Sequence, residues 1–200
     1  MKPIIIAITG PSCAGKDTLM RQLYWEFSKD YEKLVNYPDV YYIVSSTTRP
    51  PRKNEENHKD YHFISEEKFQ ELIDRDCFLE WAEFRKWKYG TDKLNICEKP
   101  GAINIGVFNL QGIDNLNKQD DFIIIPIYLI VDWKERLRRS IKREGHLTFE
   151  MIRRLITDYK DFKKPYKILG NSGNLLCYTK NYDIDKVLSD ILGKIELYNL

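Results

Sequence analysis

The sequence predicts an α/β fold, a parallel sheet flanked by helices, with a small mixed β/α lobe inserted into it and a helical lid. Three observations predict it. Apolar, β-branched runs alternate with amphipathic segments, as in βαβ units around a parallel sheet. A glycine-bounded loop ending in lysine follows the first apolar run. Residues 61–90 instead carry short aromatic runs around a single helical pattern.

The elements follow from these patterns in chain order. Strands of the main sheet are expected at 3–9, 40–46, 102–108, 122–130 and 174–179. Helices are expected at 16–29, 66–74, 110–117, 132–142, 148–163 and 184–198. The run at 122–130 is apolar on both faces, which is typical of a strand covered on both sides. Residues 164–174 are rich in Gly, Asn and Lys and are expected to form a loop.

Composition limits the classes of function. The 200 residues suffice for one compact domain, and 32 Lys+Arg nearly balance 30 Asp+Glu, so we expect no nucleic-acid or membrane partner. The four cysteines form no C-x-x-C pair, which argues against zinc and a disulfide framework and favours a reducing cytosol. The apolar stretch after Met1 is too short for a signal peptide or a membrane span. We therefore expect a cytoplasmic protein, whose oligomeric state the sequence leaves open.

A phosphate-binding loop follows the first strand. Its backbone N–H groups and the N-terminus of the next helix favour an anion, and Lys16 adds a full charge that can follow a transferring phosphoryl group. This strand–loop–helix unit predicts a fold of the P-loop NTPase type that binds ATP. The candidate ATP-binding residues here are Gly10, Pro11, Ser12, Cys13, Ala14, Gly15, Lys16, Asp17 and Thr18. Asp17 stands where the magnesium-binding hydroxyl usually stands, and Thr18 comes one place later.

A second motif, at 45–63, suits a phosphate acceptor. Arg49 and Arg52 bracket a Pro-Pro pair, which stiffens the loop so that the two guanidinium groups lose less freedom when they bind an anion. Further on, 78–82 and 89–91 add a carboxylate, a phenol and a hydroxyl.

Together these motifs resemble the guanylate kinase family. The patterns S-S-T-T-R-x-P-R-x-x-E, D-Y-x-F, F-L-E-W-A and Y-G-[ST] occur in the family's order and spacing, and the resemblance covers about residues 3–198. It implies an enzyme of purine nucleotide metabolism, a transferase that phosphorylates GMP, and dGMP as well, with ATP as donor and Mg²⁺ as cofactor. It also implies a core at 3–44, 92–131 and 164–198, an NMP-binding lobe at 45–91 and a lid at 132–163.

The resemblance also implies roles for residues of the acceptor site. Glu80 would accept hydrogen bonds from guanine N1–H and the 2-amino group, and Ser45 and Thr91 would serve the neighbouring atoms. Adenine offers no matching donors, so a buried Glu80 would reject AMP. The candidate GMP-binding residues are Ser45, Arg49, Arg52, Glu55, Tyr61, Glu80, Tyr89 and Thr91, with Glu55 bracing the two arginines.

The lid is the helix–loop–helix around 132–157. Arg136, Arg143 and Arg154 match the family's lid arginines, but this lid is longer than usual, and Arg139 is the alternative to Arg143. Asn181 matches a family asparagine near the ATP base. The resemblance implies ATP contacts for Arg136 and Asn181, and the candidate catalytic residues are Lys16, Arg49, Arg52, Arg143 and Arg154.

The chain departs from the family pattern in two ways. Asn54, His58 and Lys86 stand where glycines are common. Val107 and Asn109 replace two acids of the motif D-x-D-x-Q-G that lie near the metal. We hypothesise that Asp17 supplies the missing acid for Mg²⁺ from within the phosphate loop. The alternative is that Asp17 only interacts favourably with the helix dipole.

Two other functions stay open on the sequence alone. A kinase of the same fold could act on a modified or deoxy purine monophosphate, given Val107 and Asn109. A non-catalytic guanylate-kinase-like module that binds proteins is the other, although Lys16 and the arginines are retained.

Overall fold

A parallel five-stranded sheet forms the centre of the molecule. The computed structural model describes residues 2–29, 39–52, 55–163, 165–169, 173–179 and 181–197. The sheet order is β2-β7-β1-β8-β9, and its strands are β1 (Ile4–Thr9), β2 (Val40–Tyr42), β7 (Ile103–Val107), β8 (Ile123–Ile130) and β9 (Leu176–Thr179). Each neighbouring pair is parallel. The predicted parallel α/β core is confirmed.

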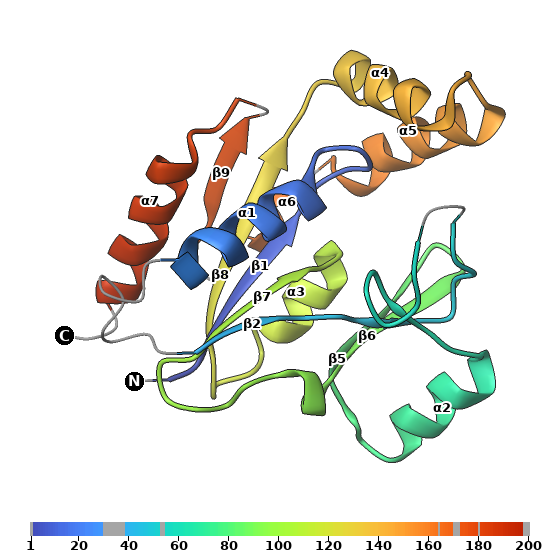
Figure 1. Cartoon of the computed structure of the whole chain (residues 1–200). Coiled ribbons are helices and arrows are strands. Elements are labelled where there is room, and N and C mark those ends of the chain that lie inside the picture. Colours follow the sequence, from blue (N-terminus) through green and yellow to red (C-terminus); the bar gives the residue numbers. More distant parts are fainter. Residues whose placement is uncertain are drawn as a thin grey trace.

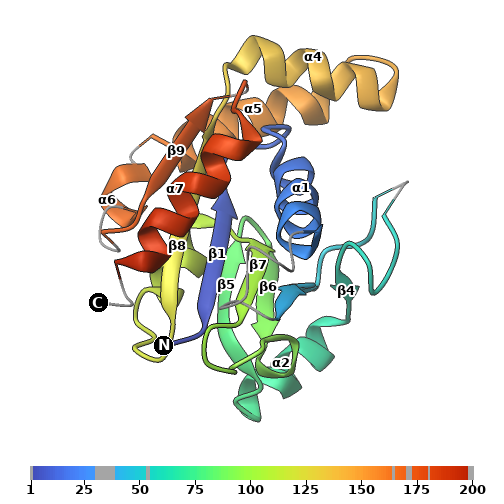
Figure 2. The ribbon, with the colours of Figure 1, turned by 60° about the vertical axis from the view of Figure 1, so that its left-hand side comes forward.

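Helices cover both faces of this sheet, as the alternation of buried residues in β1 requires. Ile4, Ile6 and Ile8 face one cluster, which includes residues of α1 (Lys16–Lys29) and α7 (Ile184–Glu196). Ile5 and Ala7 face a second cluster, with α3 (Leu110–Leu116) and α6 (Pro165–Leu169). Figure 1 shows the sheet between these layers, and Figure 2 shows α1 and α7 on the same side.

A second sheet lies beside the core. Its order is β4-β3-β6-β5, with β3 (Ser46–Thr47), β4 (His62–Phe63), β5 (Phe78–Phe84) and β6 (Trp87–Asp92), and α2 (Glu66–Asp74) packs on it. We call residues 46–92 the small sheet unit. It rests on α3, whose Asn115 donates a 2.8 Å hydrogen bond to the carbonyl of Trp81. A short 3₁₀ helix, η1 (Lys93–Asn95), leads back to the core.

Two helices project beyond the carboxyl ends of the core strands (Figure 1). These are α4 (Trp133–Glu144), capped by Asp132, and α5 (Phe149–Asp161), capped by Thr148. Gly145, at a φ of +85°, ends α4 and turns the chain back. We call this pair the α4–α5 hairpin. None of the helices among the described residues is both long and apolar enough to cross a membrane.

Two expectations were wrong. Residues 40–46 are not one strand: β2 pairs with β7 in the core, whereas Ser46 and Thr47 pair with β6, and residues 43–45 cross between the two sheets. Residues 165–169 form α6 instead of a loop, because Leu169 completes the apolar cluster under the sheet. Residue 198 of the helix expected at 184–198, and residues 164 and 170–172 of the loop expected at 164–174, lie outside the described residues.

Candidate functional site

One cleft of about 1180 Å³ lies between the core, the small sheet unit and the α4–α5 hairpin. Most of the sequence-predicted residues line it: Gly10, Ser12, Cys13, Ala14, Gly15, Lys16, Asp17, Thr18, Ser45, Arg49, Arg52, Glu55, Tyr61, Glu80, Tyr89, Arg143 and Arg154. Pro11, Thr91, Arg136 and Asn181 do not line it. The structure thus gathers both the phosphate-loop residues and the acceptor-motif residues around one space.

The phosphate loop turns tightly between β1 and α1. Gly10 has a φ of +147°, and a Cβ there would lie 2.9 Å from the carbonyl oxygen of Leu129. Nζ of Lys16 donates to the carbonyls of Gly10 at 2.9 Å and Pro11 at 3.0 Å. Burial lowers the pKa of Lys16, while Asp17 and Asp158 act in the opposite sense. A part-buried cation at a glycine-bounded loop before a helix N-terminus suits a polyphosphate.

Asp17 and Thr18 open α1 with exposed side chains at the cleft. Val107 and Asn109 also line the cleft. Val107 offers no ligand atom, and Oδ1 of Asn109 accepts a 2.7 Å hydrogen bond from the N–H of Gly112 as the cap of α3. Asp17 is therefore the carboxylate that the loop itself offers to a cation.

The two arginines of the acceptor motif share one carboxylate. Nη2 of Arg49 lies 2.9 Å from Oε2 of Glu55, and the backbone N–H of Arg52 donates to the same oxygen at 2.8 Å. The guanidinium of Arg49 lies 5.4 Å from the centroid of the Tyr61 ring, which in turn packs edge-on against Tyr89. Burial raises the pKa of Tyr61 well above its usual range, so its hydroxyl stays a donor. This cluster presents cationic and hydroxyl donors to an anion.

Three buried polar side chains form a chain of contacts at the cleft wall: Ser45 and Glu80 line the cleft, and Thr91 lies behind them. The hydroxyl of Thr91 donates to Oε1 of Glu80 at 2.8 Å and lies 3.4 Å from the hydroxyl of Ser45. All three residues are buried. Burial raises the pKa of Glu80 to about 7, against the smaller opposite effect of the Thr91 hydrogen bond. Among the described hydrogen bonds only Oε1 of this buried carboxylate has a partner, so the group suits a ligand with two adjacent donors.

The arginines of the α4–α5 hairpin occupy different places. Nη1 of Arg139 donates to the carbonyls of Cys13 and Ala14 at 3.3 and 3.1 Å, whereas Arg143, also at the cleft, pairs only with Glu144 among the described contacts. Arg154 pairs with Glu150, and the ion pairs with Arg153 and Arg154 lower the pKa of Glu150 to about 2. Arg136 is buried against Asp158 at 2.7 Å. The ATP roles of Arg136 and of the exposed Asn181 stay predictions.

His58 adopts a φ of +66°, the left-handed conformation that glycine favours, in keeping with its standing at a common glycine position. Lys86 does not: the left-handed residue of its turn is Arg85, with a φ of +64°. Asn54 lies outside the described residues.

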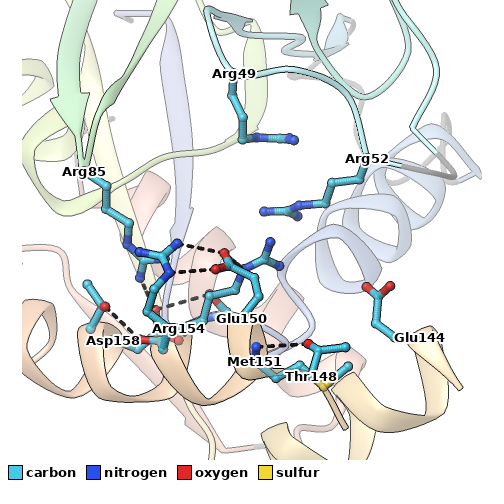
Figure 3. Close-up of polar contacts among 12 residues, drawn as sticks. Arg49, Arg52, Arg85, Glu144, Thr148, Glu150, Met151, Arg154 and Asp158 are labelled. Carbon is cyan, nitrogen blue, oxygen red and sulfur yellow. Dashed lines mark hydrogen bonds and ion pairs between the residues drawn. The ribbon is translucent and has the colours of Figure 1, made fainter. Parts of the chain in front are cut away.

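Sequence reasoning missed two residues of the site, Arg85 and Asp158. Arg85 lines the cleft from the turn between β5 and β6, and Asp158 lines it from α5 (Figure 3). Met151, Arg154 and Asp158 share one face of α5 at helical spacing, which was the available signal for Asp158.

Known proteins with a similar sequence or fold point to one family. The guanylate kinase family model matches residues 1–174. A guanylate kinase of Campylobacter jejuni strain RM1221 is 36% identical over 158 residues, covering 78% of this chain and 73% of that protein. A guanylate kinase of Prochlorococcus marinus subsp. pastoris is 31% identical over 194 residues, 96% of each chain.

Among solved structures, the crystal structure of guanylate kinase from Anaplasma phagocytophilum superposes with a TM-score of 0.64. The match covers 98% of this chain and 86% of that one at 18% identity, which shows a shared fold.

Proposed function

The chain belongs to the guanylate kinase family, and on that premise we propose how its cleft transfers the γ-phosphoryl group of ATP to GMP. The observation that carries the proposal is the contact chain Ser45–Thr91–Glu80, whose Ser45 and Glu80 line the same cleft as the phosphate loop. An acceptor base bound there has its phosphate directed toward the donor.

Guanine recognition rests on Glu80. Its carboxylate accepts from guanine N1–H and the 2-amino group, and Ser45 and Thr91 complete the contacts. Adenine would leave the buried carboxylate without donors, which costs binding free energy. No described residue that lines the cleft is assigned a contact with the ribose 2′ position. We therefore propose that both GMP and dGMP are accepted.

Phosphoryl transfer is in line and without a covalent intermediate. Arg49 and Arg52, braced by Glu55, hold the acceptor phosphate with help from Tyr61 and Tyr89. Lys16, Arg143 and Arg154 offset charge on the transferring group. We assign the small sheet unit as the acceptor lobe and the α4–α5 hairpin as the lid, whose closure excludes water from the reacting atoms.

Mg²⁺ fits the oxygen donors at the start of α1. Among the described residues, no group of three or more His, Cys, Asp or Glu could hold a metal ion. Mg²⁺ does not need such a group, because it is commonly held by one or two carboxylates together with substrate phosphates and water. Asp17 would supply that carboxylate, and the ion would neutralise phosphate charge. We place the enzyme in the cytoplasm, where its nucleotide substrates occur and where its free thiols stay reduced.

An acceptor panel tests the proposal. ADP release is measured with ATP and each of GMP, dGMP, AMP, UMP, CMP and dTMP. Activity confined to GMP and dGMP supports the assignment, and activity with dGMP alone narrows it to a deoxy purine. GMP binding without ADP release from any acceptor would overturn it in favour of a non-catalytic module.

A further inference from the structure

Asp158 collects donors from three separate parts of the protein. From its place on α5, its carboxylate accepts from the N–H of Ser12 in the phosphate loop at 2.9 Å and from Nη1 of Arg136 on α4 at 2.7 Å. It also accepts from Nη2 of Arg85 at 2.8 Å. Only 2% of the Asp158 side chain is exposed, so these contacts replace water.

Arg85 brings the small sheet unit to the α4–α5 hairpin. It occupies the tight turn between β5 and β6 in a left-handed conformation, and its Nη2 also lies 3.4 Å from Oδ2 of Asp161. Figure 3 shows Arg85 reaching from the strands toward α5, above Arg154 and Asp158. The ion pairs with Asp158 and Asp161 thus join the two parts that flank the cleft.

The charges in this cluster balance. Asp158 and Asp161 are matched by Arg85 and Arg136, which are themselves largely buried. If the small sheet unit moves away, Asp158 keeps Ser12 and Arg136, while Arg85 reaches water. Opening therefore breaks the ion pairs of Arg85 but leaves no buried carboxylate unpaired. Most buried ion pairs are costly to break because one charge stays buried without a partner. Such a contact can form and release repeatedly.

We propose that Arg85 and Asp158 are positioning residues for phosphoryl transfer. Their ion pair holds the small sheet unit closed on the α4–α5 hairpin, and the same carboxylate fixes the N–H of Ser12. The carboxylate that holds the cleft closed over the acceptor is thus the same one that holds the phosphate loop. The inference rests on the proposed function, since it concerns how the two substrates are brought together.

The test is Arg85→Gln, which removes the pairing charge but leaves Ser12 and Arg136 in place. We expect kcat/KM for GMP to fall about tenfold, as for loss of a hydrogen bond between charged groups, with KM for ATP within twofold of wild type. Because closure excludes water, inorganic phosphate released per GDP formed should rise. Arg85→Lys should recover part of the loss, because a single nitrogen makes both contacts. A merely structural residue would alter the melting temperature but not the phosphate-to-GDP ratio.

Arg75→Gln is the matched control. It removes the same charge from the small sheet unit, where exposed Arg75 pairs with Glu71 away from the cleft, and should leave both readouts unchanged. Adding Arg85→Gln to Asp158→Asn should cause much less than its full loss, because only the 3.4 Å contact with Asp161 is then left to break, whereas fully multiplying losses would refute the pairing. Wild-type kcat/KM and phosphate release in Arg85→Gln would overturn the inference. Failure of the wild-type protein to phosphorylate GMP would instead overturn the proposed function.

Discussion

The hydroxyl of Thr91 donates a 2.8 Å hydrogen bond to Oε1 of Glu80 at the wall of the cleft. This bond fixes one carboxylate oxygen and leaves the other directed toward Gly112 of α3, where an added Cβ would lie 2.8 Å from Oε2. The carboxylate is therefore held between a strand of the small sheet unit and a helix of the core. Several consequences can be measured.

Glu80→Gln should abolish efficient use of GMP. The glutamine amide places its own N–H₂ donor opposite one of the two guanine donors, and two donors cannot form a hydrogen bond. We therefore expect kcat/KM for GMP to fall by about two orders of magnitude. Steady-state kinetics with GMP and AMP measure this. Glu83→Gln, exposed on the same strand, should behave as wild type. A Glu80→Gln enzyme within twofold of wild type would refute the assigned role.

GMP binding should weaken in acid. Burial raises the pKa of Glu80 to about 7, and guanine requires the ionised form. The Kd for GMP should therefore rise as the pH falls below about 7, by up to about tenfold per pH unit. Calorimetry from pH 5.5 to 8.5 checks this. Because the phosphate of GMP titrates near pH 6, the effect of Glu80 is the difference from Glu80→Gln. Identical pH profiles for the two proteins would contradict it.

In the ligand-free protein, the buried Glu80 carboxylate should lower the free energy of unfolding above neutral pH. The folded state keeps the Glu80 proton up to about pH 7, whereas the unfolded state loses it near its usual value of 4.5. The free energy of unfolding therefore falls as pH rises through this window. Glu80→Gln should be more stable than wild type at pH 8 by roughly 1–3 kcal/mol, and the gain should vanish at pH 4. Urea denaturation at both pH values measures it, and equal stability at pH 8 would rule it out.

Gly112→Ala should disturb the acceptor site without unfolding the protein. The new methyl group displaces the Glu80 carboxylate, so KM for GMP should rise severalfold while KM for ATP holds. Gly193→Ala on α7 meets nothing within 4 Å. It should therefore raise the free energy of unfolding by about 0.5–1 kcal/mol and leave the kinetics unchanged. An unaltered KM for GMP in Gly112→Ala would show that Glu80 tolerates the displacement.

Asp17→Ser should raise the Mg²⁺ concentration needed for half-maximal activity severalfold, because no other carboxylate lies within the loop. Adding Val107→Asp should restore part of the dependence from the end of β7. If Asp17 only complements the dipole of α1, Asp17→Ser would cost about 0.3–1 kcal/mol of stability and leave the Mg²⁺ titration unchanged.

The elements of the core were predictable because their signals are local. Apolar runs located β1, β7, β8 and β9, and amphipathic spacing located the helices between them. The crossing at 43–45 was not predictable, because it depends on which distant strand each residue pairs with.

The residues of the candidate site likewise divide into those that the sequence could predict and those that it could not. Lys16 and Arg49 could be chosen from spacing and chemistry and Glu80 from the family resemblance, and the fold places all three at one cleft. The pairing of Arg85 with Asp158 could not be predicted, because the two residues are 73 positions apart in sequence; the helical spacing on α5 could suggest Asp158 alone. Contacts between separate parts of a fold leave no periodic signal in either part.

The sheet order also sets a sequence of events during synthesis. β1 leaves the ribosome first, yet its two neighbours, β7 and β8, follow roughly 100 and 120 residues later. The small sheet unit, whose strands are close in sequence, can pair before either arrives. Gly10 packs against Leu129, so the phosphate loop at the start of the chain is shaped only when nearly two-thirds of the protein has been made. In a nascent chain the strands of the small sheet unit can therefore pair before the phosphate loop meets Leu129.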